Sequence, residues 1–182
     1  MSQGKPTVLV LTIGHSTRPL ADFLAILKAH GVEKVVDVRT VPRSRHNPQF
    51  NQETLPQSLA AVAIGYVHLS GLGGLRHPRR DSPNLGWHND SFRGFADYML
   101  TPEFAEHLQA LIDLARQARL VLMCAETVPW RCHRSLIADA LTVRGLKVEH
   151  IISEPKLQEH RLTPFARVEG ARITYPPEGD GT

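Results

Sequence analysis

The chain has few of the residues that define several large classes of protein. It has two cysteines in 182 residues, too few for the disulfide framework of a small secreted domain. Its longest apolar runs are strand-sized, whereas a membrane-spanning helix needs about 20 apolar residues, so we expect no membrane partner. Residues 1–6 lack the charged and then apolar layout of a signal peptide. These absences favour a cytoplasmic protein with reduced thiols.

Lysine is scarce among the positive charges. It supplies five of the 21 cationic residues, and arginine supplies the other 16. The formal net charge is +3 and the isoelectric point is near 9.1. Arginine forks bind carboxylates and phosphates through two parallel hydrogen bonds, whereas lysine acts as a point charge. A GC-rich genome produces the same bias, so the positions of the arginines have to decide whether they serve a ligand.

Short apolar runs alternate with helical patterns along most of the chain. Strands are expected at 7–13, 34–38, 66–69, 120–124 and 147–152, and helices at 19–30, 52–64, 91–119 (broken at 101–103) and 135–143. This alternation predicts an α/β fold of three layers, with a mainly parallel sheet of about five strands and helices on both faces. We expect the strand order 3-2-1-4-5, which puts the first and fourth strands side by side.

The alternating pattern fades after Glu154. Residues 1–152 are therefore predicted to form a single α/β domain, and residues 153–182 a C-terminal extension. A short strand is expected at 172–175, and the chain from Pro176 to its end is predicted to be disordered.

The densest group of reactive side chains follows the fourth expected strand. Cys132 falls in or near the first turn of a helix and is flanked by Arg131, His133 and Arg134. A helix N-terminus and neighbouring cations both lower the pKa of a thiol, so we predict that Cys132 is a nucleophile with a depressed pKa. The alternative is a small buried hydrophobe. Cys124, between uncharged neighbours, is expected to be structural.

Parallel strands end at the same edge of a sheet, so other polar residues are expected beside this thiol. His15 or His133 would serve as its base, and Glu126 as an acid/base group or as the ion-pair partner of Arg39 or Arg134. The expected ligand-binding residues at this edge are Ser16, Asp37, Arg39, Arg43, Arg45, Gly73, Gly74 and Arg134. Replacing Arg39 with alanine is expected to abolish anion binding without unfolding the protein.

Several of these segments together resemble a known family, the domain of unknown function 488. They are Thr12–Ser16, Val36–Arg39, Pro42–Arg45, Leu72–Gly74, Thr101–Phe104, Cys124–Glu126, Cys132–Arg134 and Val148–Ile151, with Phe95, Tyr98 and Met99 between them. The resemblance covers roughly residues 8–152. It implies a compact α/β domain and supports this choice of residues, and it leaves the reaction and any cofactor open.

The leading hypothesis is a protein that binds a phosphorylated or otherwise anionic small molecule, nucleotide-like, at the carboxyl ends of the strands, with thiol chemistry at Cys132. One alternative is a nucleic-acid-binding module without catalysis, in which Trp87, Phe92 and the basic segment at 76–80 stack and hold a single strand. Another is a metal site made by His15, Cys124, Glu126 and Cys132. A third is a structural or regulatory domain. The long polar segment at 70–90 is expected to act as a lid over the crevice.

Overall fold

A computed structural model describes residues 6–179 of the chain. The expectations for the N-terminal stretch before residue 6, and for residues 180–182 of the end predicted to be disordered from Pro176, lie outside these described residues. Residues 176–179 of that end are described, and they include a turn at 178–179. None of the described helices is long and apolar enough to cross a membrane.

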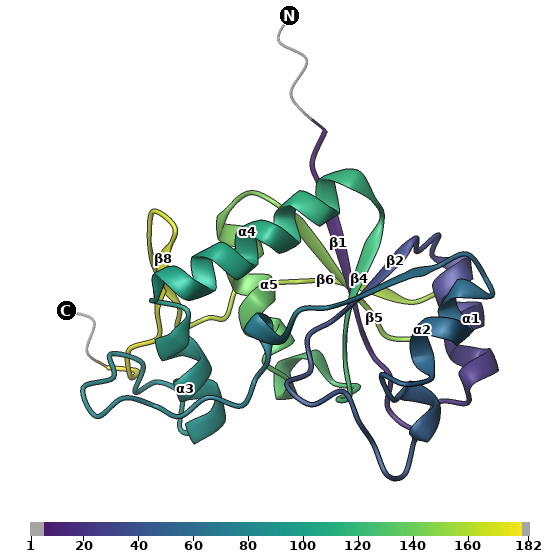
Figure 1. The fold of residues 1–182 in the computed structure, drawn as a ribbon. Coiled ribbons are helices and arrows are strands. Elements are labelled where there is room, and N and C mark those ends of the chain that lie inside the picture. The colour runs from purple at the N-terminus through teal and green to yellow at the C-terminus, as the bar shows by residue number, and fades with distance from the viewer. Residues whose placement is uncertain (1–5, 180–182) are drawn as a thin grey trace, which may run out of the picture.

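One sheet runs through the middle of the molecule (Figure 1). Its strands are β1 (Leu9–Gly14), β2 (Lys34–Asp37), β3 (Gly65–His68), β4 (Leu120–Cys124), β5 (Lys147–Ile151) and β6 (Leu157–Glu159). They lie in the order β3-β2-β4-β1-β5-β6. The first five strands are parallel to one another, and β6 runs antiparallel to β5.

Helices cover both faces of this sheet, which confirms the predicted three-layer α/β fold. They are α1 (Leu20–Ala29), α2 (Leu55–Ala60), α3 (Asp90–Tyr98), α4 (Pro102–Gln117) and α5 (Arg134–Val143). Figure 1 shows α1 and α2 on one side of the sheet, and α4 and α5 on the other. Short 3-10 helices lie at Pro48–Phe50, Ser70–Leu72 and Pro129–Arg131, and a separate hairpin is made by β7 (Arg167–Glu169) and β8 (Arg172–Thr174).

Successive side chains of the central strands enter two different cores. Leu122 of β4 packs with residues of α4 and α5, whereas Val121 and Met123 pack with residues of α1 and α2. All five residues of β4 are buried, and each large apolar side chain so buried contributes about 1.5–3 kcal/mol. A strand this apolar on both faces suits the interior of a parallel sheet.

The expected strand order is only partly right. The first and fourth strands are neighbours, as predicted, but β4 lies between β1 and β2 instead of beyond β1. Chain crossovers from β1 and β2 run toward one edge of the sheet, and those from β3 and β4 run toward the other. Right-handed crossovers in opposite directions place their helices on opposite faces. The carboxyl end of β4 is therefore at the point where the connections diverge, which is where open α/β sheets bind ligands.

The expected helix at 52–64 is shorter in the structure, where α2 covers only Leu55–Ala60. Ala63 adopts a left-handed backbone conformation, with φ of +60°, which a continuing helix does not allow. The strand β6 was missed because all three of its residues are exposed and carry no apolar run. The strand expected at 172–175 is confirmed as β8.

Residues beyond 152 contact the helical layer through one buried carboxylate. Asp139 of α5 is fully buried and accepts hydrogen bonds from His160 Nε2 (2.7 Å), Thr163 Oγ1 (2.6 Å) and Tyr175 Oη (2.8 Å). Tyr175 is itself fully buried. The division of the chain at residue 152 stays a prediction. In the structure, the segment beyond residue 152 supplies the edge strand β6 and the buried Tyr175.

Gly14, at the end of β1, lies against the loop that follows β4. A Cβ atom on Gly14 would stand 1.9 Å from the carbonyl oxygen of Glu126 and 2.7 Å from Thr127 Cα. Both are backbone atoms, so a side chain here must displace the loop. Glycine is therefore required at this crossing.

We predict that Gly14→Ala destabilises the protein by about 3 kcal/mol, the upper end of the usual cost of overpacking. The reason is that the loop at Glu126 and Thr127 has to move. The matched control is Gly65→Ala, where the new methyl would meet the flexible side chain of Lys34 at 3.3 Å and the carbonyl oxygen of Glu33 at 3.8 Å, an ordinary van der Waals distance. Urea unfolding of both variants measures the difference. Equal midpoints for the two variants would contradict the close crossing.

Candidate functional site

A hollow with a volume of about 480 Å³ opens at the carboxyl ends of β2 and β4. It is lined by Arg39, Thr40, Val41, Arg43, Gly74, Leu75, Asn89, Ser91, Phe92, Cys124, Ala125, Glu126, Arg131, Cys132 and His133. Three arginines, one acid, one histidine and both cysteines of the chain thus share one cavity. The structure brings together here the sequence-predicted residues Arg39, Arg43, Gly74, Glu126, Cys132 and His133.

The two cysteines form a hydrogen-bonded pair inside this hollow. Cys124 is the last residue of β4, and Cys132 lies two residues before α5. Cys132 Sγ donates to Cys124 Sγ across 2.8 Å. Both thiols are free and buried, with 3% of Cys124 and 7% of Cys132 exposed. Cys124, expected to be structural, is therefore part of the same site as the predicted nucleophile.

A fully buried arginine stands beside Cys124. Arg134 Nη1 donates to Cys124 Sγ (2.9 Å) and to the carbonyl of Glu126 (2.7 Å), and its Nη2 donates to the carbonyl of Thr127 (2.8 Å). The exposed fraction of Arg134 is 0%, so its guanidinium N–H groups are not accessible to a ligand. The expected ligand-binding role of Arg134 is replaced by an internal one, in which it holds the loop and the thiol.

The two thiols differ in acidity, in the opposite order to the one predicted. Burial opposes ionisation of Cys124, but the hydrogen bond from Cys132 and the charge of Arg134 outweigh it, and the pKa of Cys124 falls to about 7. The pKa of Cys132 is raised well above its usual value, because its protonated thiol donates a hydrogen bond to Cys124 and because it is buried. The predicted depressed pKa of Cys132 is therefore wrong, and Cys124 is the more acidic thiol of the pair.

His133 is the histidine nearest to the thiols. Its Nε2 donates to the carbonyl of Val38 (2.9 Å), and its Nδ1 lies 3.6 Å from Cys132 Sγ. A neutral ring that donates from Nε2 carries its lone pair on Nδ1, so that lone pair faces the thiol. Burial lowers the pKa of His133 to about 4. Of the two histidines predicted as a base, only His133 has a ring nitrogen directed at a thiol among the described residues.

His15, Asp37 and Arg39 form a second polar cluster, on the face of the sheet covered by α1 and α2. Arg39 binds Asp37 through Nε (2.9 Å) and Nη2 (2.7 Å), and its Nη1 lies 3.3 Å from His15 Nε2. The His15 ring stacks on Phe50. Tyr66 Oη also donates to Asp37 (2.6 Å). Asp37 is fully buried and 7% of Arg39 is exposed.

These contacts correct the expected ligand roles of Asp37 and Arg39. Arg39 lines the hollow, but its donors are committed to the Asp37 carboxylate and to the carbonyl of Phe50 (2.7 Å). Burial is the largest cause that lowers the pKa of His15, to about 4. None of the three lies within hydrogen-bond distance of a thiol in the described residues. The His15, Asp37 and Arg39 cluster stabilises the end of β2 beside the hollow.

Glu126 is exposed, and its Oε1 accepts the backbone N–H of Val128 (3.2 Å). None of the ion pairs among residues 6–179 includes this carboxylate, so the expected pairing with Arg39 or Arg134 is wrong. Arg134 reaches the carbonyl of Glu126 instead. The carboxylate is left at the wall of the hollow.

The remaining predicted ligand residues divide into those at the hollow and those outside it. Arg43 lines its mouth and pairs with Glu53 (2.7 Å), both largely exposed. Gly74 lies against the His133 ring and Gly73 against Thr40, each closer than a Cβ atom would allow. Arg45 is exposed and does not line the hollow. Ser16 does not line it either, and its left-handed backbone (φ +50°) lets its N–H donate to the carbonyl of Ala125 (2.9 Å).

Sequence reasoning missed two wall residues, Asn89 and Ser91, and considered their neighbour Phe92 only for stacking on nucleic acid. Asn89 caps α3 by accepting from the N–H groups of Ser91 and Phe92, and this cap holds the start of α3 against the hollow. An asparagine followed by a helical pattern is the signal that could have found it. Trp87, expected to stack on nucleic acid, packs instead on Phe92 and Phe165.

A metal site does not emerge from the side chains. No group of three or more His, Cys, Asp and Glu residues within 6–179 is arranged to hold an ion. Of the four ligands considered, His15 faces Arg39, a cation that repels a metal ion.

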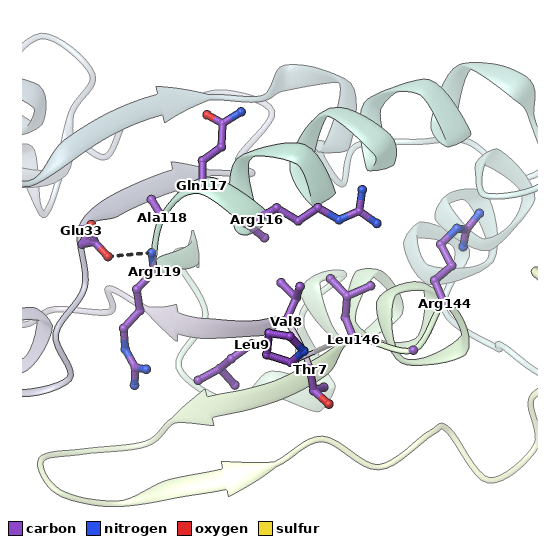
Figure 2. A pocket seen from close by; sticks show the side chains of 13 residues that line it. Thr7, Val8, Leu9, Glu33, Arg116, Gln117, Ala118, Arg119, Arg144 and Leu146 are labelled. Atoms are coloured by element: carbon purple, nitrogen blue, oxygen red, sulfur yellow. Dashed lines mark hydrogen bonds between the residues drawn. The ribbon is translucent and has the colours of Figure 1, made fainter. Parts of the chain in front are cut away.

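A larger hollow, of about 850 Å³, lies at the opposite, amino-terminal edge of the sheet. Figure 2 shows its walls, where Arg116 and Arg144 flank the apolar side chains of Val8 and Leu146. The N–H of Arg119 donates to Glu33 there (3.1 Å). No cysteine or histidine is among the described residues that line it. The groups capable of covalent chemistry are at the carboxyl edge.

Comparison with known proteins gives a family and no activity. A family model described as "Domain of unknown function DUF488" matches residues 19–141, a span that includes β2, β3 and β4 and ends within α5. No curated protein and no solved structure matches the chain.

We predict that Arg39→Ala destabilises the protein by about 3–5 kcal/mol, because it leaves the buried Asp37 carboxylate without its cation. This outcome replaces the expectation that the variant keeps its fold. Arg45→Ala, at an exposed position, is the control and should change stability by less than about 0.5 kcal/mol. Urea denaturation at neutral pH compares them, and similar losses in both variants would show that the ion pair is not needed.

Stability is predicted to decrease as the pH falls from about 6.5 to about 4. The pKa of His133 in the folded protein is lowered to about 4, so the unfolded chain binds a proton in this range and the folded one does not. The contribution of His133 to stability is complete above its pKa in the unfolded chain. It is lost as the pH falls from that value to its pKa in the folded protein. His15 and His150, with their lowered pKa values, act in the same direction.

Urea unfolding across this range should show a shallower dependence on pH for His133→Gln than for the parent protein. His46→Gln, at an exposed position, is the control and should keep the parent dependence. If both variants follow the parent curve, His133 is protonated equally in the folded and unfolded states.

Proposed function

The chain belongs to the DUF488 family, whose description names no activity, and from its own residues we propose that it is a thiol-dependent protein acting on small anionic molecules. The hollow at the carboxyl ends of β2 and β4 binds a compound that carries phosphate or carboxylate groups. Cys124, as a thiolate, is the nucleophile. Cys132, the nucleophile predicted from the sequence, is the proton donor to that thiolate.

The observation that carries this proposal is the environment of Arg134. Its guanidinium is fully buried and carries a positive charge. No ion pair among residues 6–179 gives it a carboxylate partner. A buried charge without a counter-ion is costly, and the one side-chain atom that its Nη groups contact is Cys124 Sγ, at 2.9 Å. Ionisation of Cys124 supplies the missing negative charge.

The wall of the hollow supports an anionic substrate. Arg131 and Arg43 are exposed at its mouth, and Arg43 shares its charge with only the exposed Glu53. Solvent-exposed pairs of this kind are weak, so Arg43 can turn to a ligand at little cost. Guanidinium groups bind phosphate and carboxylate in forked geometry. The cations thus hold the anionic group while the thiolate reaches an electrophilic atom beside it.

Glu126 and His133 give the site its proton carriers. The Glu126 carboxylate stands at the wall with only the Val128 N–H as partner, where it can exchange a proton with a leaving group. The lone pair of His133 Nδ1 faces Cys132. A nucleophile, a proton donor and a base on one cavity wall are the parts needed for nucleophilic catalysis.

The charge of the hollow can be tested with two alkylating agents of nearly equal size, anionic iodoacetate and neutral iodoacetamide. We predict that Cys124 favours iodoacetate more than a free cysteine does. Arg131→Gln should lower that preference by about two- to fivefold, as expected for one partly screened charge, and added salt should lower it too. Arg45→Gln, which changes an exposed arginine outside the hollow, is the matched control. Mass spectrometry of the alkylated protein gives both rates.

Cys124→Ser should remove the fast alkylation altogether. A preference no greater than that of free cysteine, or one that Arg131→Gln and Arg45→Gln lower equally, would overturn the anionic site. Alkylation that persists in Cys124→Ser would assign the nucleophile to Cys132.

A further inference from the structure

The hollow holds two thiols, whereas simple nucleophilic attack needs one. We propose that Cys124 and Cys132 act together as a dithiol that reduces small disulfides carrying carboxylate groups. This inference rests on the proposed function, because it uses the same hollow and the same thiolate. It adds the class of substrate and a role for the second thiol.

The geometry of the pair supports this role. The two sulfur atoms are 2.8 Å apart, and a disulfide needs about 2.05 Å, so less than about 1 Å of approach separates the dithiol from the bonded state. The residues that join them, 125–131, include an exposed loop that can absorb a movement of this size. Any adduct formed on Cys124 Sγ has Cys132 Sγ as its nearest nucleophile.

The two thiols are also prepared for different steps. Cys124 faces the Arg134 guanidinium, whereas Cys132 holds its proton between Cys124 Sγ and His133 Nδ1. When Cys124 becomes a neutral mixed disulfide, it no longer balances the charge of Arg134. That charge, together with the backbone N–H of Arg134 at 3.5 Å from Cys132 Sγ, then favours ionisation of Cys132. The second nucleophile therefore forms only after the first has reacted.

Two exchanges complete the reaction. In the first, Cys124 thiolate attacks one sulfur of the substrate disulfide, a bond forms between them, and the other half of the substrate leaves as a thiolate. In the second, Cys132 loses its proton, which ends on the departing thiolate, and its sulfur attacks Cys124 Sγ and releases the remaining half. The two cysteines lose two electrons and the substrate gains two. An external thiol restores the dithiol by the reverse exchanges.

The hollow favours a small anionic disulfide over a protein disulfide. Both sulfur atoms lie at the buried wall of a cavity of about 480 Å³, which a folded partner cannot enter. Arg43 and Arg131 at the mouth match carboxylates, and Phe92 and Leu75 supply apolar contact. A carboxylate-bearing disulfide of small size has the required chemistry.

The aromatic dicarboxylate disulfide 5,5′-dithiobis(2-nitrobenzoate) is a suitable probe, because each exchange releases a coloured thiolate. The parent protein should release about two equivalents and end as an internal disulfide without an adduct. Cys132→Ser should release about one equivalent and keep the other half of the probe on Cys124. Arg131→Gln should slow the first release by about two- to fivefold, and Arg45→Gln should not. Intact-mass measurement identifies each product.

Two stable adducts on the parent protein, one on each cysteine, would overturn this inference. This result is obtained with the parent protein alone, so it does not depend on whether a variant folds. The proposed anionic thiol site would then still stand if iodoacetate selectivity were retained. Loss of both the selectivity and the exchange would overturn both. An adduct trapped on Cys132 in Cys124→Ser, at the parent rate, would contradict the assigned order of attack.

Discussion

The buried guanidinium of Arg134 is the constraint on which the site depends. It ties the loop after β4 to the start of α5 through the carbonyls of Glu126 and Thr127, and it places a full positive charge beside Cys124. A charge in this position must be balanced, because desolvation costs several kcal/mol per ion. In the proposed function, the Cys124–Cys132 pair provides the balance by sharing a single proton. The proposed reactivity of Cys124 and the stability of this junction then depend on the same guanidinium.

The sheet topology explains why this interaction occurs where it does. The strand β4 is buried on both faces and lies between β1 and β2, and its connection leaves toward α5 while those of its neighbours leave toward α1 and α2. This divergence opens the hollow at the end of β4. Gly14 allows the loop to pass directly over the end of β1, and the Asp37–Arg39 pair fixes the end of β2 beside it.

Much of the fold and the location of the site could be predicted from the sequence. Apolar runs identified the five parallel strands, and the junction at Cys124–Arg134 identified the edge that carries the hollow. The period of two along a strand could also have shown that Cys124 and Asp37 face opposite sides of the sheet, since they fall in step with Leu122 and Val35, which enter different cores. The expectation that all the polar residues share one crevice overlooked this alternation.

The order of acidity of the thiols could not be predicted in the same way. Sequence neighbours suggested that the cations next to Cys132 would activate it, but the guanidinium of Arg134 turns back toward Cys124, ten residues away in the chain. Likewise, the arginine at 39 was expected to serve a ligand, but its partner is the carboxylate two residues before it. Both outcomes depend on side-chain direction, which three-dimensional packing decides.

The central claim is that the buried thiol pair loses one of its two protons near neutral pH. Thiolate absorbance in the ultraviolet, followed by pH titration of the reduced protein, measures this charge directly. The account predicts one thiolate per chain with a midpoint near the pKa of Cys124, about 7, and a midpoint shifted to higher pH in Cys124→Ser. A titration that shows no thiolate until the pH reaches the range of ordinary cysteine, about 8.5, would contradict it.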